Sequence, residues 1–175
     1  MSYLKNIFTT GAVRETPKRI ISRLVAEIAP SRGRVNIIEI GAGKGEITAE
    51  VVKRLTPARQ GHFHVFEIDE AATGFLKQRF PHVQVHHSDA FHFAGALPGD
   101  FTANYIISSI PLSFYKKEQI RDLLATMLQK LDTQGKIIIL FSAPWLIPLL
   151  SSELPQGKLT PFLTFPPYFL YTWQR

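Results

Sequence analysis

Short apolar runs alternate with amphipathic segments along most of this chain. Apolar residues that follow one another, or alternate with polar ones, predict strands, and apolar residues at every third or fourth position predict helices. The predicted strands cover residues 35–40, 62–68, 83–87, 105–108 and 136–141, and the predicted helices cover residues 46–55, 71–79 and 117–131. Such alternation with short connections specifies a parallel sheet with helices on both faces. We therefore predict a doubly wound α/β fold.

Each end of the chain adds one element. Thr16-Pro17 predicts a helix start with Thr16 as the N-cap, and Pro30 is expected to end that helix. The apolar positions of this amphipathic helix fall on one face: Ile20, Ile21, Leu24, Val25 and Ile28. In the tail, Tyr171 and Trp173 alternate with Leu170 and Thr172, which predicts a final strand within residues 161–175.

Composition narrows the class of protein. Of 175 residues, 45% are hydrophobic and 19% are charged, which is typical of a globular chain long enough for a proper core. The lack of cysteine excludes disulfides and cysteine-based zinc sites, and it fits a reducing cytoplasm. Lys5, Arg14 and Lys18 interrupt any apolar N-terminal segment, so no signal peptide is expected. No apolar run reaches the ~20 residues of a membrane span.

The net charge of +6 is concentrated near the N-terminus. Residues 1–34 hold seven Lys and Arg against two Glu, a net of +5, whereas residues 35–175 hold thirteen against twelve, a net of +1. We therefore divide the chain into a basic arm with its helix, residues 1–34, and a body, residues 35–175. A basic arm indicates an anionic partner, either nucleic acid or an acidic lipid surface. A solvated helix face explains the charge equally well.

Candidate chemistry begins where the first predicted strand ends. Glu39-Ile40 is followed by Gly41-Ala42-Gly43-Lys44-Gly45 and then at once by a helix. Glycines in such a turn let bare backbone approach a ligand, and their G-x-G-x-G spacing departs from the G-x-G-x-x-G of dinucleotide sites. The loop therefore indicates a nucleoside cofactor other than NAD. Glu39 lies inside the strand, so it needs a donor from a backbone amide, a hydroxyl or the cofactor's ammonium.

Two further acids end the next two predicted strands. A carboxylate at Glu67 can accept hydrogen bonds from the ribose hydroxyls of a nucleoside, which we favour over a solvated strand end. Asp89 accepts from an adenine amine or, in the alternative interpretation, caps a turn. In a parallel sheet these strand ends, and Ser108 at the end of the fourth strand, open onto one crevice.

Residues 39–45, 66–69 and 89–90 together resemble the motifs of the class I S-adenosylmethionine-dependent methyltransferases. The resemblance covers the chain from about residue 10 to its end, and it implies a Rossmann-like fold with an antiparallel last strand. It also implies S-adenosyl-L-methionine as cofactor, with the three glycines beside the methionine part, Glu67 at the ribose and Asp89 at the adenine. The implied cofactor-binding residues are Glu39, Gly41, Ala42, Gly43, Gly45, Glu67, Ile68, Asp89, Ala90 and Ser108.

The segment after the fourth predicted strand carries the substrate signal. Enzymes that methylate nucleobase amines usually have Asn/Asp-Pro-Pro-Tyr/Phe there, because a delocalised amine needs acceptors for its N–H groups and an aromatic plate. Ser108-Ser109-Ile110-Pro111-Leu112 has neither, and it resembles the Ser-Ser-Leu-Pro segment of bacterial phospholipid N-methyltransferases. Thr10-Gly11-Ala12-Val13 and Phe165-Pro166-Pro167 are also similar to that family. The resemblance implies methylation of the phosphatidylethanolamine amine, with Ser109, Ile110 and Pro111 as the catalytic segment.

An enzyme that methylates a lipid headgroup must sit on a bilayer, so the resemblance implies a cytoplasmic protein, peripheral on the inner face of the membrane. Tyr3, Leu4, Ile7 and Phe8, with the basic helix face, are candidates to bind an anionic interface. The apolar helix face is expected to pack on the sheet, and residues 145–150 are either a second membrane contact or a buried connection. Two rivals stay open: an RNA or DNA adenine methyltransferase whose arm binds phosphates, and a cofactor-binding protein without catalysis.

Aromatic and histidine residues complete the candidates. Four aromatic residues near the predicted mouth are available to hold a methylated ammonium, although core packing is the expected fate of most: Phe114, Tyr115, Tyr168 and Tyr171. All six histidines lie between His62 and His92 without the carboxylate spacing of a known metal site, so no metal is expected. No histidine is placed as the base that takes the amine proton.

Overall fold

A seven-stranded sheet forms the centre of the molecule. The computed structural model describes residues 16–29, 33–55 and 60–175. In spatial order the strands are β3 (Gln84–His87), β2 (Gln60–Glu67), β1 (Val35–Ile40), β4 (Ala103–Ser108), β5 (Leu131–Phe141), β7 (Tyr168–Gln174) and β6 (Lys158–Phe162). Strands β1 to β5 are parallel, and β7 runs antiparallel to β5 and β6. The predicted mostly parallel sheet with an antiparallel last strand is confirmed.

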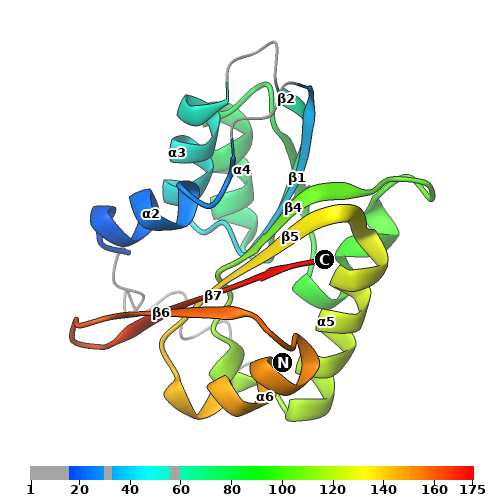
Figure 1. Ribbon diagram of the computed structural model, residues 1–175. Coiled ribbons are helices and arrows are strands. Elements are labelled where there is room, and N and C mark those ends of the chain that lie inside the picture. The colour runs from blue at the N-terminus through cyan, green and yellow to red at the C-terminus, as the bar shows by residue number, and fades with distance from the viewer. Residues whose placement is uncertain (1–15, 30–32, 56–59) are drawn as a thin grey trace.

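Helices cover both faces of the sheet (Figure 1). On one face lie α2 (Lys18–Val25), α3 (Glu46–Arg54) and α4 (Glu70–Arg79); on the other lie the 3-10 helix η1 (Ala90–Ala96), α5 (Lys117–Lys130) and α6 (Ile147–Glu153). The sheet separates two hydrophobic cores. Ile37 lies in the core under α2, α3 and α4, and Ile38 lies in the core under η1, α5 and α6, because successive strand side chains point to opposite faces. None of the helices in the described ranges has the length and apolar composition that crossing a bilayer requires. The strand order reverses between β1 and β4, so a ligand is expected beyond the carboxyl ends of these two strands.

The N-terminal helix α2 packs on the sheet, as expected from its pattern. Its four apolar residues are buried in one core with Ile37 and Ile138, and so is Ile28, just beyond the end of the helix. The prediction of Thr16 as N-cap is wrong. Pro17 holds that position, and its carbonyl accepts from the amides of Ile20 and Ile21. A proline fits there because it has no N–H to satisfy.

Several sequence-based candidates precede or follow α2. Pro30, the predicted end of this helix, lies outside the described residues, and so do Tyr3, Leu4, Ile7, Phe8 and residues 10–13. The helix itself ends at Val25. The division of the chain at residue 34 stays a prediction.

The C-terminal part contains two elements that the hydrophobic pattern does not predict. Strand β6 contains Pro161 and lies at the sheet edge with mostly half-exposed side chains, so it lacks the pattern of a buried strand. Helix α6 is short and follows the 3-10 helix η3 (Pro144–Leu146). Leu146, Leu149 and Leu150 are buried here, whereas Trp145 is 68% exposed. Residues 145–150 are therefore largely a buried connection with one exposed aromatic side chain.

Candidate functional site

The glycine loop turns the chain from β1 directly into α3. Gly41, Gly43 and Gly45 all have positive φ, at 80°, 54° and 80°, a region that side-chain-bearing residues rarely adopt. The Gly41 amide donates to the carbonyl of Phe66 at 2.8 Å, which fixes the loop to the end of β2. A Cβ on Gly41 would lie 2.5 Å from Cγ2 of Ile110, whereas a Cβ on Gly43 would meet nothing within 4 Å. The loop is therefore tightly packed at Gly41 and open to the cavity at Gly43.

Glu67 connects this loop to the end of β2. Its buried carboxylate accepts from three backbone amides: Gly43 at 2.7 Å, Ile68 at 2.8 Å and Asp69 at 2.9 Å. A carboxylate has about four acceptor positions on its two oxygens, so capacity remains for a ligand hydroxyl. The Asp69 carboxylate caps α4 by accepting from the Ala72 amide at 2.7 Å. Backbone contacts thus hold both acids in place.

The ends of β3 and β4 supply the other side of the site. Asp89 caps η1 by accepting from the Phe91 amide at 2.9 Å, as in the turn-cap interpretation, and it also lines the cavity described below. The Ser109 amide donates to the carbonyl of Ile40 at 3.1 Å, and its hydroxyl donates to that of Gly41 at 2.8 Å. Ser109 therefore ties the segment after β4 to the glycine loop.

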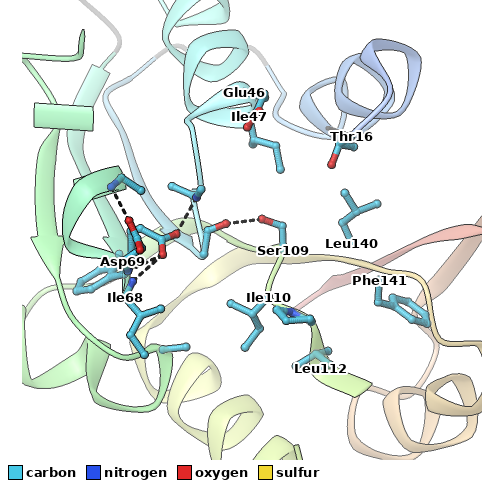
Figure 2. Close-up of a pocket in the computed structure, with 18 of the residues that line it drawn as sticks. Thr16, Glu46, Ile47, Ile68, Asp69, Ser109, Ile110, Leu112, Leu140 and Phe141 are labelled. Carbon is cyan, nitrogen blue, oxygen red and sulfur yellow. Dashed lines mark hydrogen bonds between the residues drawn. The ribbon is translucent and has the colours of Figure 1, made fainter. Parts of the chain in front are cut away.

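A cavity of about 510 Å³ lies at these carboxyl ends. In Figure 2, Ile68 and Asp69 lie at one end, Leu140 and Phe141 at the other, and Ser109 and Ile110 between them. The charged lining residues are four carboxylates and one lysine: Glu46, Glu67, Asp69, Asp89 and Lys44. The cavity thus favours a positively charged occupant. Around Leu140 and Phe141 the lining is uncharged, with Thr16, Ser142, Ala143 and Tyr168.

Most of the residues expected at the site line this cavity. Those that do are Gly41, Ala42, Gly43, Glu67, Ile68, Asp89, Ala90, Ser109, Ile110 and Pro111. Three expected cofactor-binding residues, Glu39, Gly45 and Ser108, are buried behind its wall. A Cβ on Gly45 would meet Leu76 and Phe80 at 2.6 and 2.7 Å, so this glycine lets α4 pack against the loop. The Ser108 hydroxyl has no hydrogen-bond partner among the described residues.

Glu39 is fully buried beneath the glycine loop. One carboxyl oxygen accepts from the Thr48 hydroxyl at 2.8 Å, and the other has no partner within the described part of the chain. Burial raises the pKa of Glu39 to about 8, and the nearby carboxylates of Glu46 and Glu67 add to the rise against the opposing Thr48 bond. At neutral pH this side chain is therefore a protonated acid. The Thr48 hydroxyl is one of the three donors considered from the sequence, and a bond from the cofactor's ammonium stays a prediction.

Two of the four aromatic candidates line the cavity, Tyr115 and Tyr168. Phe114, in the 3-10 helix η2 (Leu112–Phe114), is largely exposed, and Tyr171 is buried with its hydroxyl donating to the Leu154 carbonyl at 2.8 Å. Burial raises the pKa of Tyr115, with contributions from Asp89 and Glu67, so its hydroxyl stays protonated. Sequence reasoning did not name the charged lining residues Lys44, Glu46 and Asp69 as site residues, and it also missed Thr16 and residues 140–143. The end of the fifth predicted strand at Phe141 was the available signal for the latter.

Four of the six histidines lie in β2 and β3, and the closest pair is formed across these two strands. His64 Nδ1 and His86 Nε2 are 2.9 Å apart, and His86 stacks on Phe66 with ring centroids 4.6 Å apart. Burial lowers the pKa of His64 to about 4, with help from the neighbouring His86 and His62, and burial also lowers that of His86. Within the described ranges, no three or more His, Asp or Glu side chains are grouped to hold a metal ion.

Comparisons with known proteins identify the fold. The N-methyltransferase NodS from Bradyrhizobium japonicum WM9, solved with S-adenosyl-L-homocysteine, superposes with a TM-score of 0.73 at 14% identity, over 97% of this chain and 97% of that one. TrmN from Thermus thermophilus superposes with a TM-score of 0.74 at 18% identity, over 96% of this chain and 52% of that one. An rRNA methylase from Streptococcus thermophilus gives 0.67 at 14% identity, over 91% and 97%. This chain has the class I methyltransferase fold. No protein-family model and no curated protein sequence matches it.

Proposed function

We propose that this chain is an S-adenosylmethionine-dependent N-methyltransferase. The observation that carries the proposal is the junction of Gly43 and Glu67 at the cavity wall, where an open glycine backbone meets a carboxylate with spare acceptor capacity. In this proposal the loop from Gly41 borders the methionine part, Glu67 accepts from the ribose and Asp89 lies at the adenine. Nucleoside ligands of doubly wound sheets bind beyond the strand ends at the switch point, which is where this cavity lies.

The charge of the cavity favours an amine as methyl acceptor. Four carboxylates and one lysine line the cavity. S-adenosylmethionine, when bound, would supply the methyl group of its sulfonium. An alkylamine arrives as an ammonium, which the same carboxylates attract. Once the ammonium has lost a proton to water, the lone pair of the neutral amine needs in-line placement rather than activation by a ring-binding motif. The segment after β4 has no side-chain amide and no aromatic ring at Ser109, Ile110 and Pro111, in agreement with an aliphatic amine as acceptor.

We propose the phosphatidylethanolamine headgroup as that amine. The uncharged end of the cavity, at Leu140, Phe141 and Tyr168, suits the less polar part of a lipid beside its headgroup. In this proposal the protein is cytoplasmic and works on the inner face of the membrane. Deprotonation of the ammonium is left to water, because no histidine lines the cavity among the described residues and Tyr115 stays protonated.

RNA is the second candidate acceptor. Two structural neighbours are an rRNA methylase and TrmN, and the net charge of +6 suits a phosphate-rich partner. The carboxylates at the cavity favour the lipid amine over RNA, because an alkylamine carries a positive charge that they attract and a nucleobase amine is neutral.

A labelled methyl donor separates the candidates. S-adenosylmethionine with a radioactive methyl group is incubated with the full chain and three acceptors: vesicles containing phosphatidylethanolamine, vesicles of phosphatidylcholine alone, and ribosomal RNA. The proposal predicts label in the phosphatidylethanolamine lipids and none in phosphatidylcholine. Label in RNA alone would refute the lipid substrate. Binding of the donor without transfer to any acceptor would support the non-catalytic alternative.

A further inference from the structure

Exposed apolar side chains gather at the end of the sheet where the parallel strands terminate and the cavity lies; we call this surface the rim. Six large apolar side chains are exposed in the described part of the chain: Ile68, Phe75, Phe114, Trp145, Leu163 and Phe165. Ile68, Phe114 and Trp145 follow the carboxyl ends of β2, β4 and β5. Strand β6 runs parallel to β5, because both are antiparallel to β7, so the turn after Phe162 lies at the same end. Only Phe75, in the middle of α4, lies elsewhere.

The turn between β6 and β7 is the most prominent part of this rim. Leu163 is 96% exposed and Phe165 is 92% exposed. In Figure 1 this turn projects at the left of the view, and η3, which carries Trp145, lies at the lower left. Leaving such side chains in water forgoes ~1.5–3 kcal/mol each relative to burial. Their concentration beside one cavity therefore indicates a surface that something covers.

Cations border these apolar groups. Arg19, in the first turn of α2, donates from Nη2 to the carbonyl of Leu163 at 3.3 Å, so a guanidinium lies beside the apolar turn. Lys18 is its exposed neighbour. Lys116 and Lys117 follow η2 at the start of α5 and are exposed, with Glu118 offsetting one of the four charges. Three nearby acids do not add negative charge to this rim, because their carboxylates accept from backbone amides and face the cavity: Glu67, Asp69 and Asp89.

We propose that this rim is the docking surface for an anionic lipid bilayer, with Leu163, Phe165 and Trp145 in the headgroup–acyl boundary and Arg19, Lys116 and Lys117 at the level of the phosphates. Apolar side chains flanked by cations are the combination that interfacial binding requires. The inference rests on the proposed function for the identity of the substrate: with the rim on the bilayer, the cavity opens onto the layer that holds phosphatidylethanolamine.

A bilayer explains the rim better than RNA does. Proteins hold single-stranded bases by stacking on aromatic faces, and the most exposed side chain here, Leu163, is aliphatic. In the same turn, Pro166 has no backbone N–H to donate to a phosphate. An aliphatic and an aromatic residue at the tip of one turn are suited to a hydrocarbon boundary.

Vesicle sedimentation tests the proposal with the full chain and without cofactor. The probes are vesicles of phosphatidylcholine alone and of phosphatidylcholine with phosphatidylglycerol. The wild type should bind the anionic vesicles more strongly. Leu163→Ser should lower that binding about tenfold, and Arg19→Gln about fivefold. Matched controls are Phe75→Ser, an exposed aromatic away from the rim, and Arg34→Gln, an exposed cation at the amino end of β1; both should bind like wild type.

Three results would overturn the proposal. They are equal binding by Leu163→Ser and Phe75→Ser, a wild-type dimer that Leu163→Ser converts to a monomer, and retardation of RNA that depends on Leu163 without vesicle binding. Thermal melts establish that the compared variants are folded. Vesicle binding without lipid methylation would support the rim and refute the proposed substrate. Methylation of detergent-dispersed phosphatidylethanolamine without vesicle binding would support the proposed substrate and refute the rim as a docking surface.

Discussion

Replacing Glu39 by Gln should change how the stability of this protein depends on pH. The pKa of this buried carboxyl is raised from 4.5 to about 8, so the folded chain keeps a proton that the unfolded chain releases. A raised pKa contributes stability that is fully present below pH 4.5 and is lost as the pH rises toward 8. Each pH unit in that window costs ~1.4 kcal/mol, so the wild type loses about 3 kcal/mol between pH 5.5 and 8 on this account.

The glutamine variant carries no titrating group at this position. Its side-chain oxygen can still accept from the Thr48 hydroxyl, which in the wild type lies 2.8 Å from Glu39. Urea unfolding at pH 5.5, 7 and 8 measures the free energy of unfolding of both proteins, and their difference cancels every other titration. The stability of Glu39→Gln relative to wild type should rise by about 3 kcal/mol across this range. A difference that does not vary with pH would show that Glu39 is ionised in the folded protein.

Two further predictions concern the loop and the histidine pair. Gly41→Ala should lower the free energy of unfolding by about 3 kcal/mol, since φ is 80° and the new Cβ would lie 2.5 Å from Ile110, whereas Gly43→Ala should cost about 1 kcal/mol. Equal losses in denaturant titrations would contradict this packing. The lowered pKa of His64, about 4, means that acid destabilises the fold as the pH falls from 6.5. His64→Phe should reduce the loss between pH 6.5 and 4.5 by about 2 kcal/mol in the same titrations, and an unchanged acid limb would count against a neutral His64.

The sheet could be predicted from the sequence because its central strands are buried on both faces. The predicted strand at residues 35–40 coincides with β1, since four apolar residues among six, on both faces and between polar turns, favour a buried strand. Strand β6 could not be predicted, because it is short, contains Pro161 and owes its place to pairing with β7. The start of β5 at Leu131 rather than at residue 136 also depends on pairing, here with Ala103 of β4.

At the site, the sequence could identify residues that end strands but not those brought in by packing. Glu67 and Asp89 follow the logic of parallel strand ends, and both line the cavity. Thr16 reaches it only because α2 packs on the sheet, which no local pattern encodes. The hydrogen bond from the Gly43 amide to Glu67 could not be predicted either, since it depends on the approach of the loop after β1 to the end of β2.

Titration of S-adenosylmethionine into the protein by calorimetry tests the central claim most directly. We predict one binding site in the wild type and affinity at least about tenfold weaker in Glu67→Ala, which loses the acceptor for the ribose and for the Gly43 amide. Glu70→Ala removes an exposed acid three positions further along that does not line the cavity, and it should bind like wild type. Absence of binding by the wild type, or equal affinity in both variants, would contradict the cofactor site described here.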